Sequence, residues 1–140
     1  MRQHLEEFEV EGAGKGLVEI TAQVARCVAD SKVSEGLCTV FVRHTSASLI
    51  IQENADPSVR RDLENFLDKL VPEGDPDYTH TEEGLDDMPA HIKGALTATS
   101  LGVPVMGGRL ALGTWQGIFL WEHRRRRSGR KVVVQVMGQG

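Results

Sequence analysis

Leu37-Cys38-Thr39-Val40-Phe41-Val42 is an apolar run, rich in residues that favour strands, that directly follows Gly36. A continuous run of this kind predicts a central strand that is buried on both faces. The next run along the chain, Ser48-Leu49-Ile50-Ile51-Gln52, predicts the strand beside it. The polar link of residues 43–47 is therefore expected at one end of two core strands.

Further strand-like segments lie near the two ends of the chain, and helical periodicity is grouped in the middle. Strands are predicted over residues 3–11, 103–106, 109–112, 116–122 and 131–137. Helices are predicted from Thr21, interpreted as an N-cap, from Pro57 after its cap Asp56, and over residues 90–98. This order predicts an α+β fold, namely a compact single domain over residues 1–140 with a mainly antiparallel, sandwich-like β-sheet and two to three helices.

The helix that begins at Pro57 carries an apolar stripe, which predicts that one of its faces packs on the core. The stripe consists of Val59, Leu63, Phe66, Leu67 and Leu70, and Val71-Pro72 ends the helix. Residues 72–88 follow as a long acidic loop. Loops of this length inside a small domain are usually functional, so this one is a candidate for binding residues.

The composition excludes several classes of protein. The 140 residues are 40% hydrophobic and 26% charged, which is ordinary for a soluble globular domain. No apolar run approaches the ~20 residues that span a bilayer, and the polar start resembles no signal peptide, so we expect no membrane contact. Cys27 and Cys38 lie among apolar residues and predict buried thiols in a reducing cytoplasm.

The net charge of −4 argues against a nucleic-acid partner, although the charges are unevenly distributed along the chain. Twelve of the twenty acidic residues fall between Glu53 and Asp87, whereas Arg124–Arg127, Arg130 and Lys131 form a basic segment. We interpret the arginine run as a solvated hairpin that deters edge-to-edge pairing. The alternative is contact with RNA or with an acidic neighbouring subunit.

Three of the five histidines lie in polar segments where they could meet. His44 follows a predicted core strand, His80 lies in the acidic loop, and His91 lies one turn into a predicted helix. Imidazole is the commonest ligand of zinc, and a three-histidine site leaves a position open for substrate. The alternative is three isolated polar residues, because the spacing matches no compact zinc motif. His4 and His123 are expected to face solvent.

Carboxylates and hydroxyls near these histidines extend the candidate site. Asp86, Asp87 and Glu53 could orient the imidazoles or supply a fourth ligand. Thr45, Ser46, Ser48 and Ser100, together with the cation Lys93, are the residue types that hold phosphate. The alternative is that these hydroxyls satisfy the backbone of turns. A serine hydrolase is disfavoured because the Gly-x-Ser-x-Gly elbow is missing.

Gly113-Thr114-Trp115-Gln116-Gly117 places a bulky pair between two glycines at the entry to a strand. Such glycines indicate close approach of the backbone to a ligand or to another subunit. An equally weighted interpretation is a bulge that buries Trp115 in the core.

Taken together, four segments resemble the YjbQ family in their order and spacing. They are residues 43–49, 53–57, 86–93 and 112–118, and the terminal pattern Glu122…Arg130…Val134…Gly138 also fits. The resemblance covers nearly the whole chain. Each motif is weak alone, but four in order are highly specific.

The resemblance implies an α+β fold with a sandwich-like sheet and a homotrimer. Some members are described as a secondary thiamine-phosphate synthase, which would join a pyrimidine diphosphate to a thiazole phosphate and release pyrophosphate. It further implies that His44, His80 and His91 bind a metal in a pocket near a subunit interface, and that Ser46, Trp115 and Gln116 are family positions. Three imidazoles suit zinc or a similar divalent ion better than magnesium.

The resulting hypothesis is an enzyme that acts on a small phosphorylated substrate in a histidine-lined pocket. In it His44, His80 and His91 hold the metal, and Asp87 or Glu53 orients a ligand or acts as a base. The substrate contacts are assigned to Thr45, Ser46, Lys93, Ser100, Trp115 and Gln116. The competing hypothesis is a non-catalytic module that senses a metal or a phosphometabolite at the same pocket.

Overall fold

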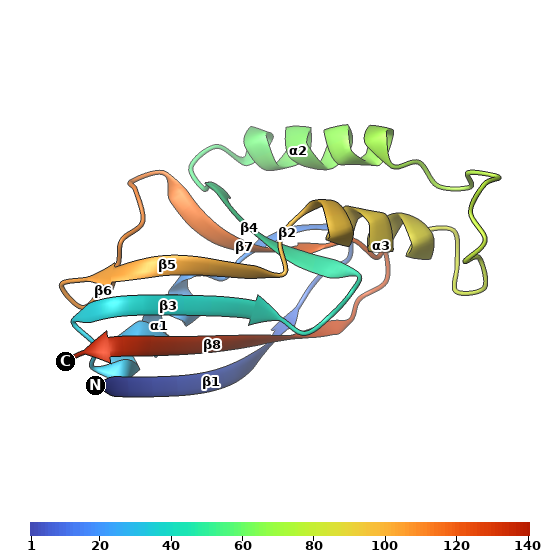
Figure 1. Cartoon of the computed structure of the whole chain (residues 1–140). Coiled ribbons are helices and arrows are strands. Elements are labelled where there is room, and N and C mark those ends of the chain that lie inside the picture. Colours follow the sequence, from blue (N-terminus) through green and yellow to red (C-terminus); the bar gives the residue numbers. More distant parts are fainter.

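The structure, a computed structural model that describes all 140 residues, is built from two antiparallel sheets and three helices (Figure 1). The first sheet has the order β1 (Arg2–Glu11), β8 (Gly129–Gln139), β3 (Glu35–Val42), β5 (Ser100–Met106) and β6 (Arg109–Leu110). The second has the order β2 (Gly16–Glu19), β7 (Gln116–Glu122) and β4 (Ala47–Glu53). The helices are α1 (Thr21–Ser31), α2 (Pro57–Leu70) and α3 (Asp87–Leu96). The predicted α+β fold is confirmed.

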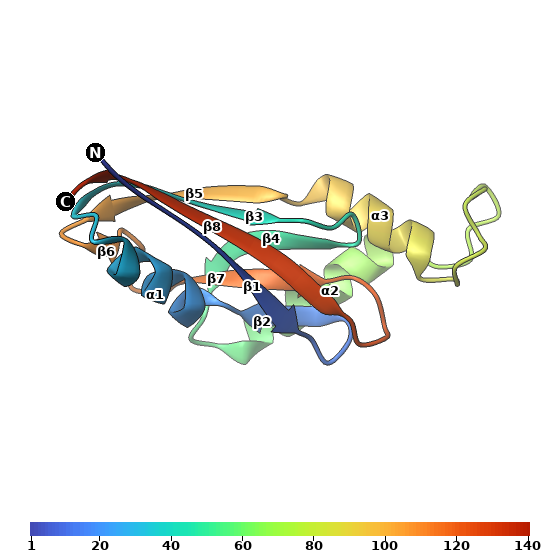
Figure 2. The ribbon, with the colours of Figure 1, turned by 90° about the horizontal axis from the view of Figure 1, so that it is seen from below.

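The apolar core lies between the two sheets and is closed by α1. Alternate residues of β8, Val132, Val134 and Val136, face inward and meet Leu49 of β4 and Leu120 of β7. Cys27 and Cys38 are fully buried in this core as free thiols, as predicted. Both chain termini lie at one end of the molecule, and the loop before α3 extends from the other end (Figure 2). No helix has the length and apolar character needed to cross a membrane.

Two predictions about strands were wrong: that β3 is buried on both faces, and that β4 lies beside it. β3 is buried on one face only, because nothing covers the outer face of the five-stranded sheet and Leu37 and Phe41 remain 49% and 44% exposed. β4 does not pair with β3 but joins the second sheet beside β7. The strand buried on both faces is β7, which is central in its sheet and has the core on one side and α2 on the other.

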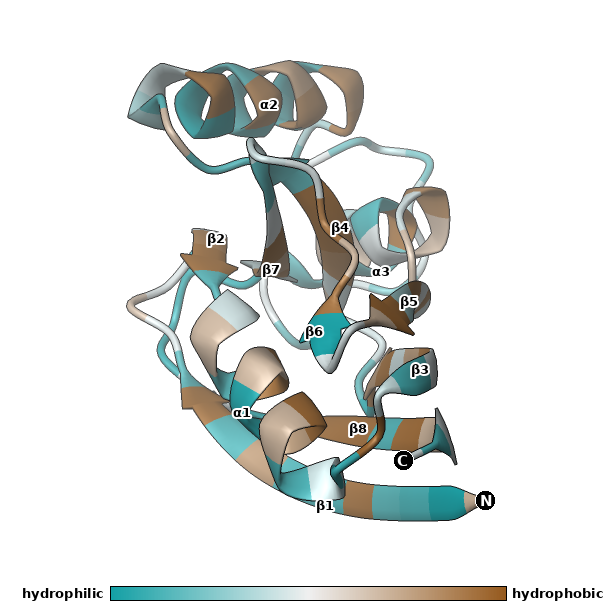
Figure 3. Cartoon of the chain, turned by 90° about the vertical axis from the view of Figure 1, so that its left-hand side faces the viewer, coloured by the Kyte–Doolittle hydropathy of each residue, from teal (hydrophilic) through white to brown (hydrophobic).

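Helix α2 starts as predicted, with the Asp56 carboxylate accepting from the Ser58 N–H and Pro57 in the first turn. Its predicted apolar stripe is not buried as a whole. Only Leu67 is buried, while Phe66 and Leu70 are 66% and 57% exposed. Figure 3 shows the helix lying apart from the strands with apolar segments along it. Polar contacts therefore contribute much of its attachment.

The polar layer beneath α2 contains two lysines, a carboxylate and a buried histidine. Lys15 and Lys93 donate to the same oxygen of Asp68, at 2.7 and 2.5 Å. His123, expected to face solvent, is only 1% exposed, and its Nε2 lies 2.9 Å from Ser48 Oγ. The expectation was wrong because charged neighbours in the sequence do not determine burial. His123 directly follows β7, which is buried on both faces.

His123 gives the fold a defined pH dependence. Burial, and then the nearby charges of Lys93 and Arg130, lower the pKa of His123 to about 3. In the unfolded chain the pKa returns to ~6.5, so only the unfolded state binds this proton at intermediate pH. Stability is therefore complete above pH 6.5 and decreases on acidification, by up to ~1.4 kcal/mol per pH unit, until the folded pKa is reached.

We expect wild type to lose about 2 kcal/mol more unfolding free energy between pH 6.5 and pH 5 than His123→Gln does. Glutamine can keep a hydrogen bond to Ser48 but does not titrate. Urea unfolding of both proteins at the two pH values measures the difference. Parallel losses in both proteins would contradict this assignment.

Candidate functional site

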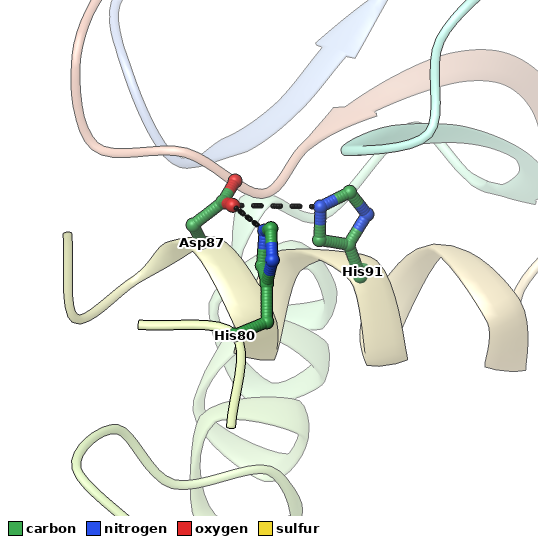
Figure 4. Close-up of side chains that lie close together, drawn as sticks. All are labelled: His80, Asp87 and His91. Atoms are coloured by element: carbon green, nitrogen blue, oxygen red, sulfur yellow. Dashed lines mark hydrogen bonds and ion pairs between the residues drawn. The ribbon is translucent and has the colours of Figure 1, made fainter. Parts of the chain in front are cut away.

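Three ligand-type side chains meet where the long loop enters α3. His80 Nε2 lies 2.6 Å from Asp87 Oδ2, and His91 Nε2 lies 3.5 Å from the same oxygen (Figure 4). The three ligand atoms are all within 4.8 Å of one another. Asp87 and His91 are four residues apart and share one face of α3, and the loop brings His80 to that face.

The oxygen of Asp87 that does not face the histidines binds Arg124, which lies on the turn between β7 and β8. Arg124 Nη1 donates to Asp87 Oδ1 at 2.7 Å, while Oδ2 remains directed at the two histidines. The same guanidinium donates to Asp86 Oδ2 at 3.1 Å and to the Glu83 carbonyl at 2.8 Å. The carboxylate is thus buried and oriented, whereas His80 and His91 stay 49% and 34% exposed.

The arginine run is therefore not simply a solvated hairpin. Arg124 is only 8% exposed, and Arg130 is also buried. Arg125 pairs with Glu73 at the start of the long loop, and its N–H donates to Asp86 Oδ2 at 2.9 Å. Burial alone would raise the pKa of Asp86, but the Arg125 N–H and the Arg124 guanidinium outweigh it and hold that pKa below its usual value. Two arginines thus clamp both ends of the acidic loop.

A groove of about 360 Å³ runs from His91 to the link between β3 and β4. His44 and Thr45 line it from that link, and Gly94 lines it from α3. A Cβ atom at Gly94 would lie 2.9 Å from the Thr45 carbonyl oxygen, so glycine is what lets helix and link approach here. Gly94 is not among the site residues that the sequence predicts.

His44 lies in this groove but outside the cluster of metal-type ligand atoms. Its Nε2 accepts from the Lys131 N–H at 2.8 Å. Burial, and then the charge of Arg130, lower the pKa of His44, which favours the neutral ring. A neutral imidazole that accepts at Nε2 carries its proton on Nδ1, so His44 offers a donor rather than a metal-binding lone pair.

The other residues predicted near phosphate lie at the same end of the molecule but have different surroundings. Ser46 Oγ accepts from Arg130 Nη2 at 3.0 Å. Lys93 is 3% exposed, and its ammonium group is paired with Asp68. Ser100 is exposed at the start of β5 and follows Thr99, which lines the groove.

Glu53, Trp115 and Gln116 lie at the opposite end of β4 and β7. In the register of these two strands, Glu53 lies opposite Gln116 at one end and Ala47 lies opposite Glu122 at the other. About 20 Å of strand separates these two ends. Trp115 is 63% exposed, which makes the interpretation of a core tryptophan wrong. The Glu53 carboxylate accepts from the Asp56 N–H at 3.1 Å, and Gln116 Oε1 accepts from the Gly113 N–H at 2.7 Å.

The fold and this cluster define a class: a two-sheet α+β protein with a histidine–aspartate constellation at one end. The family model described as UPF0047 protein YjbQ-like matches residues 6–139. The chain belongs to this family, and the resemblance deduced from its motifs is confirmed.

Relatives and solved structures agree with this assignment. The chain is 57% identical over 138 residues to a UPF0047 protein of Synechocystis sp., covering 99% of this chain and 94% of that protein. It is 43% identical over 126 residues to UPF0047 protein YjbQ of Escherichia coli O157:H7, covering 89% and 91%. An uncharacterized yjbq/upf0047 family structure from Clostridium acetobutylicum matches with a TM-score of 0.86 at 38% identity, covering 94% of this chain and 99% of that one.

Proposed function

We propose that this protein is an enzyme that acts on a small phosphorylated molecule beside a divalent metal, zinc or a similar ion. The observation that carries the proposal is the convergence of His80 Nε2, His91 Nε2 and Asp87 Oδ2 beside a groove that His91 also lines. In this proposal His80, His91 and Asp87 are the ligands. His44, which the sequence analysis grouped with the metal ligands, becomes a substrate-binding residue.

The donor set fits such an ion. Ligand atoms placed ~2.0–2.2 Å from a tetrahedral centre lie roughly 3.3–3.5 Å apart. The two separations that Asp87 Oδ2 makes with the histidines, 2.6 and 3.5 Å, lie on either side of this range, so small side-chain movements would complete the site. Arg124 supplies the outer hydrogen bond that typically orients a ligating carboxylate. A bound ion would act as a Lewis acid that neutralises charge on phosphoryl oxygens.

The groove supplies the contacts for phosphate. His44 and Thr45 line it and bring an imidazole and a hydroxyl that can donate to phosphate, and Ser46 and Ser100 are next in sequence to the lining residues Thr45 and Thr99. Lys93 contributes its charge only if its pair with Asp68 opens. The reaction class that the family resemblance suggests is a diphosphate-releasing transfer of the thiamine-phosphate synthase type, in which Glu53 orients a group or acts as a base.

The proposal includes a homotrimer located in the cytoplasm. Glu53, Trp115 and Gln116 cannot reach the metal cluster of their own chain, so they would join the site only from a second copy. The uncovered outer face of the five-stranded sheet, with Leu37 and Phe41 exposed, offers apolar surface for such contact. The two free thiols are compatible with a reducing compartment.

Tag-free protein, stripped of metal and titrated with zinc by calorimetry, is expected to bind about one ion per chain. Zinc-loaded wild type should then release pyrophosphate from the thiamine-phosphate synthase substrates, whereas His44→Ala, His80→Ala and His91→Ala should not. The His44 variant should still bind zinc, because His44 lies outside the cluster. Zinc and inorganic phosphate binding without any turnover would favour the non-catalytic module. Absence of zinc binding would overturn the proposal.

A further inference from the structure

A second group of ligand-type side chains, the β1–α1 group, consists of His4, Glu6 and Asp30. His4 and Glu6 lie on β1, and Asp30 lies on the last turn of α1. His4 Nε2 is 3.1 Å from Glu6 Oε1, and one ligand atom from each residue lies within 4.8 Å of the other two. Figure 2 shows α1 and the first part of β1 at the end of the molecule opposite the loop before α3. The group is therefore separate from the first cluster, which lies where that loop enters α3.

Regular secondary structure holds all three positions of the β1–α1 group. His4 and Glu6 are two residues apart on a strand, so they share one face of β1, and α1 packs against this strand. Val10 belongs to the same face and is buried in the core, which makes this the inner face of the sheet. Asp30 follows the fully buried Cys27 by three residues and so lies near the same side of α1. Because none of the three positions is in a loop, little ordering is needed when an ion binds.

The two carboxylates of the β1–α1 group have no cationic side chain to offset them. Glu6 pairs only with His4, and Asp30 forms no ion pair and accepts no side-chain hydrogen bond. In the first cluster, by contrast, Asp87 is paired with Arg124. Like charges that converge without a counter-ion disfavour each other, and a divalent cation would remove this cost.

A buried thiol lies behind Glu6. Burial, and then the charge of Glu6 and its hydrogen bond with the thiol, raise the pKa of Cys27 to about 12, and Cys38 and Asp30 contribute less. The thiol is therefore protonated at neutral pH and can donate to the Glu6 carboxylate. Cys27 is not among the converging ligand atoms, so it acts as an outer partner that orients a ligand, as such partners do at metal sites.

We infer that His4, Glu6 and Asp30 form a second metal site, which takes zinc or a similar divalent ion and fastens the edge strand β1 to α1. Imidazole favours zinc over magnesium or calcium, and three protein ligands leave a position open for water. His4 and Glu6 are 31% and 37% exposed, and no arginine orients them, so the ion binds more weakly here than at the first cluster. In wild type it follows the first ion as a separate, weaker event.

The double variant His80→Ala/His91→Ala removes the first cluster and leaves the β1–α1 group intact. The metal-free, full-length double variant, titrated with zinc by calorimetry, is expected to bind about one ion per chain. Its midpoint of thermal unfolding should rise with zinc concentration, because the ion binds only the folded arrangement of β1 and α1. Absence of zinc binding at millimolar concentration would overturn the second site, whereas zinc binding by wild type alone would leave the proposed function standing.

Glu6→Gln and Glu7→Gln, each made in this background, are a matched pair. Their side chains are 37% and 39% exposed, but Glu7 faces the opposite side of β1, where it pairs with the exposed Arg43. Glu6→Gln should lower the zinc affinity by at least about tenfold and abolish the thermal shift, whereas Glu7→Gln should retain both. Asp30→Asn, at an exposed position, should act as Glu6→Gln does while leaving the contact of Glu6 with Cys27 in place. Equal zinc affinities in the Glu6 and Glu7 variants would contradict the assignment.

Discussion

Asp87→Asn is expected to lower the zinc affinity by more than about 100-fold, because even outer partners of metal ligands typically contribute 10–100-fold. The carboxylate is the shared element of the cluster, with one oxygen facing both His80 and His91. An asparagine of nearly the same volume can still accept from Arg124, so the loop should keep its position. Zinc calorimetry, supported by circular dichroism to check the fold, measures the effect.

Asp86→Asn is the matched control for this experiment. Asp86 accepts from the same Arg124 and from the Arg125 N–H, but its carboxylate is outside the cluster. If Asp87 acts as a ligand, the Asp86 variant should retain most of the zinc affinity. Similar losses in both variants would mean that the carboxylates act only by fastening the loop, and the metal assignment would fail.

The bounds of a strand can be predicted from this sequence, but the number of its faces that are buried cannot. Residues 116–122 were predicted as a strand with the bounds that β7 has, because their apolar and β-prone side chains suffice. Whether such a run is buried on one face or two depends on what lies over the sheet. Both β3 and β7 are rich in apolar residues, yet the outer face of β3 is uncovered, and the doubly covered strand is β7.

In the candidate site, contacts between residues close in the sequence were also easier to predict than contacts between distant ones. Asp87 and His91 are four residues apart, so a helix there brings them together, although the helix begins at Asp87 rather than near Pro89. Nothing local places His80 beside them, because a long loop has no periodicity. His44 was grouped with the ligands, but its ring nitrogen is engaged by the backbone of β8, 87 residues away in the chain.

The charge distribution along the sequence indicates a contact between the acidic loop and the arginine run that was not predicted. An acid-rich loop and an arginine-rich turn in one small domain are complementary, and Arg124 and Arg125 do clamp that loop. The arginine run was predicted to be a solvated hairpin that deters edge-to-edge pairing. Its arginines lie instead on a turn, where successive side chains are free to reach Glu73, Asp86 and Asp87.

Arg130→Met is expected to reduce the free energy of unfolding by about 3–5 kcal/mol, since removing one partner leaves the other charge buried and uncompensated. Glu122 is fully buried, and Arg130 donates to both of its oxygens, at 2.7 and 2.5 Å. The same guanidinium reaches Ser46 Oγ at 3.0 Å, so the link that carries His44 should also loosen. Urea unfolding at neutral pH measures the loss.

The double variant Glu122→Gln/Arg130→Met separates a broken pair from a general packing defect. Removing both charges should recover a large part of the loss, because a buried ion pair contributes little beyond a neutral replacement of similar volume. Arg126→Met, at an exposed position of the same turn, should stay within about 0.5 kcal/mol of wild type. If the double variant is as unstable as Arg130→Met, the loss comes from the contacts of Arg130 with the β3–β4 link rather than from the unpaired charge of Glu122.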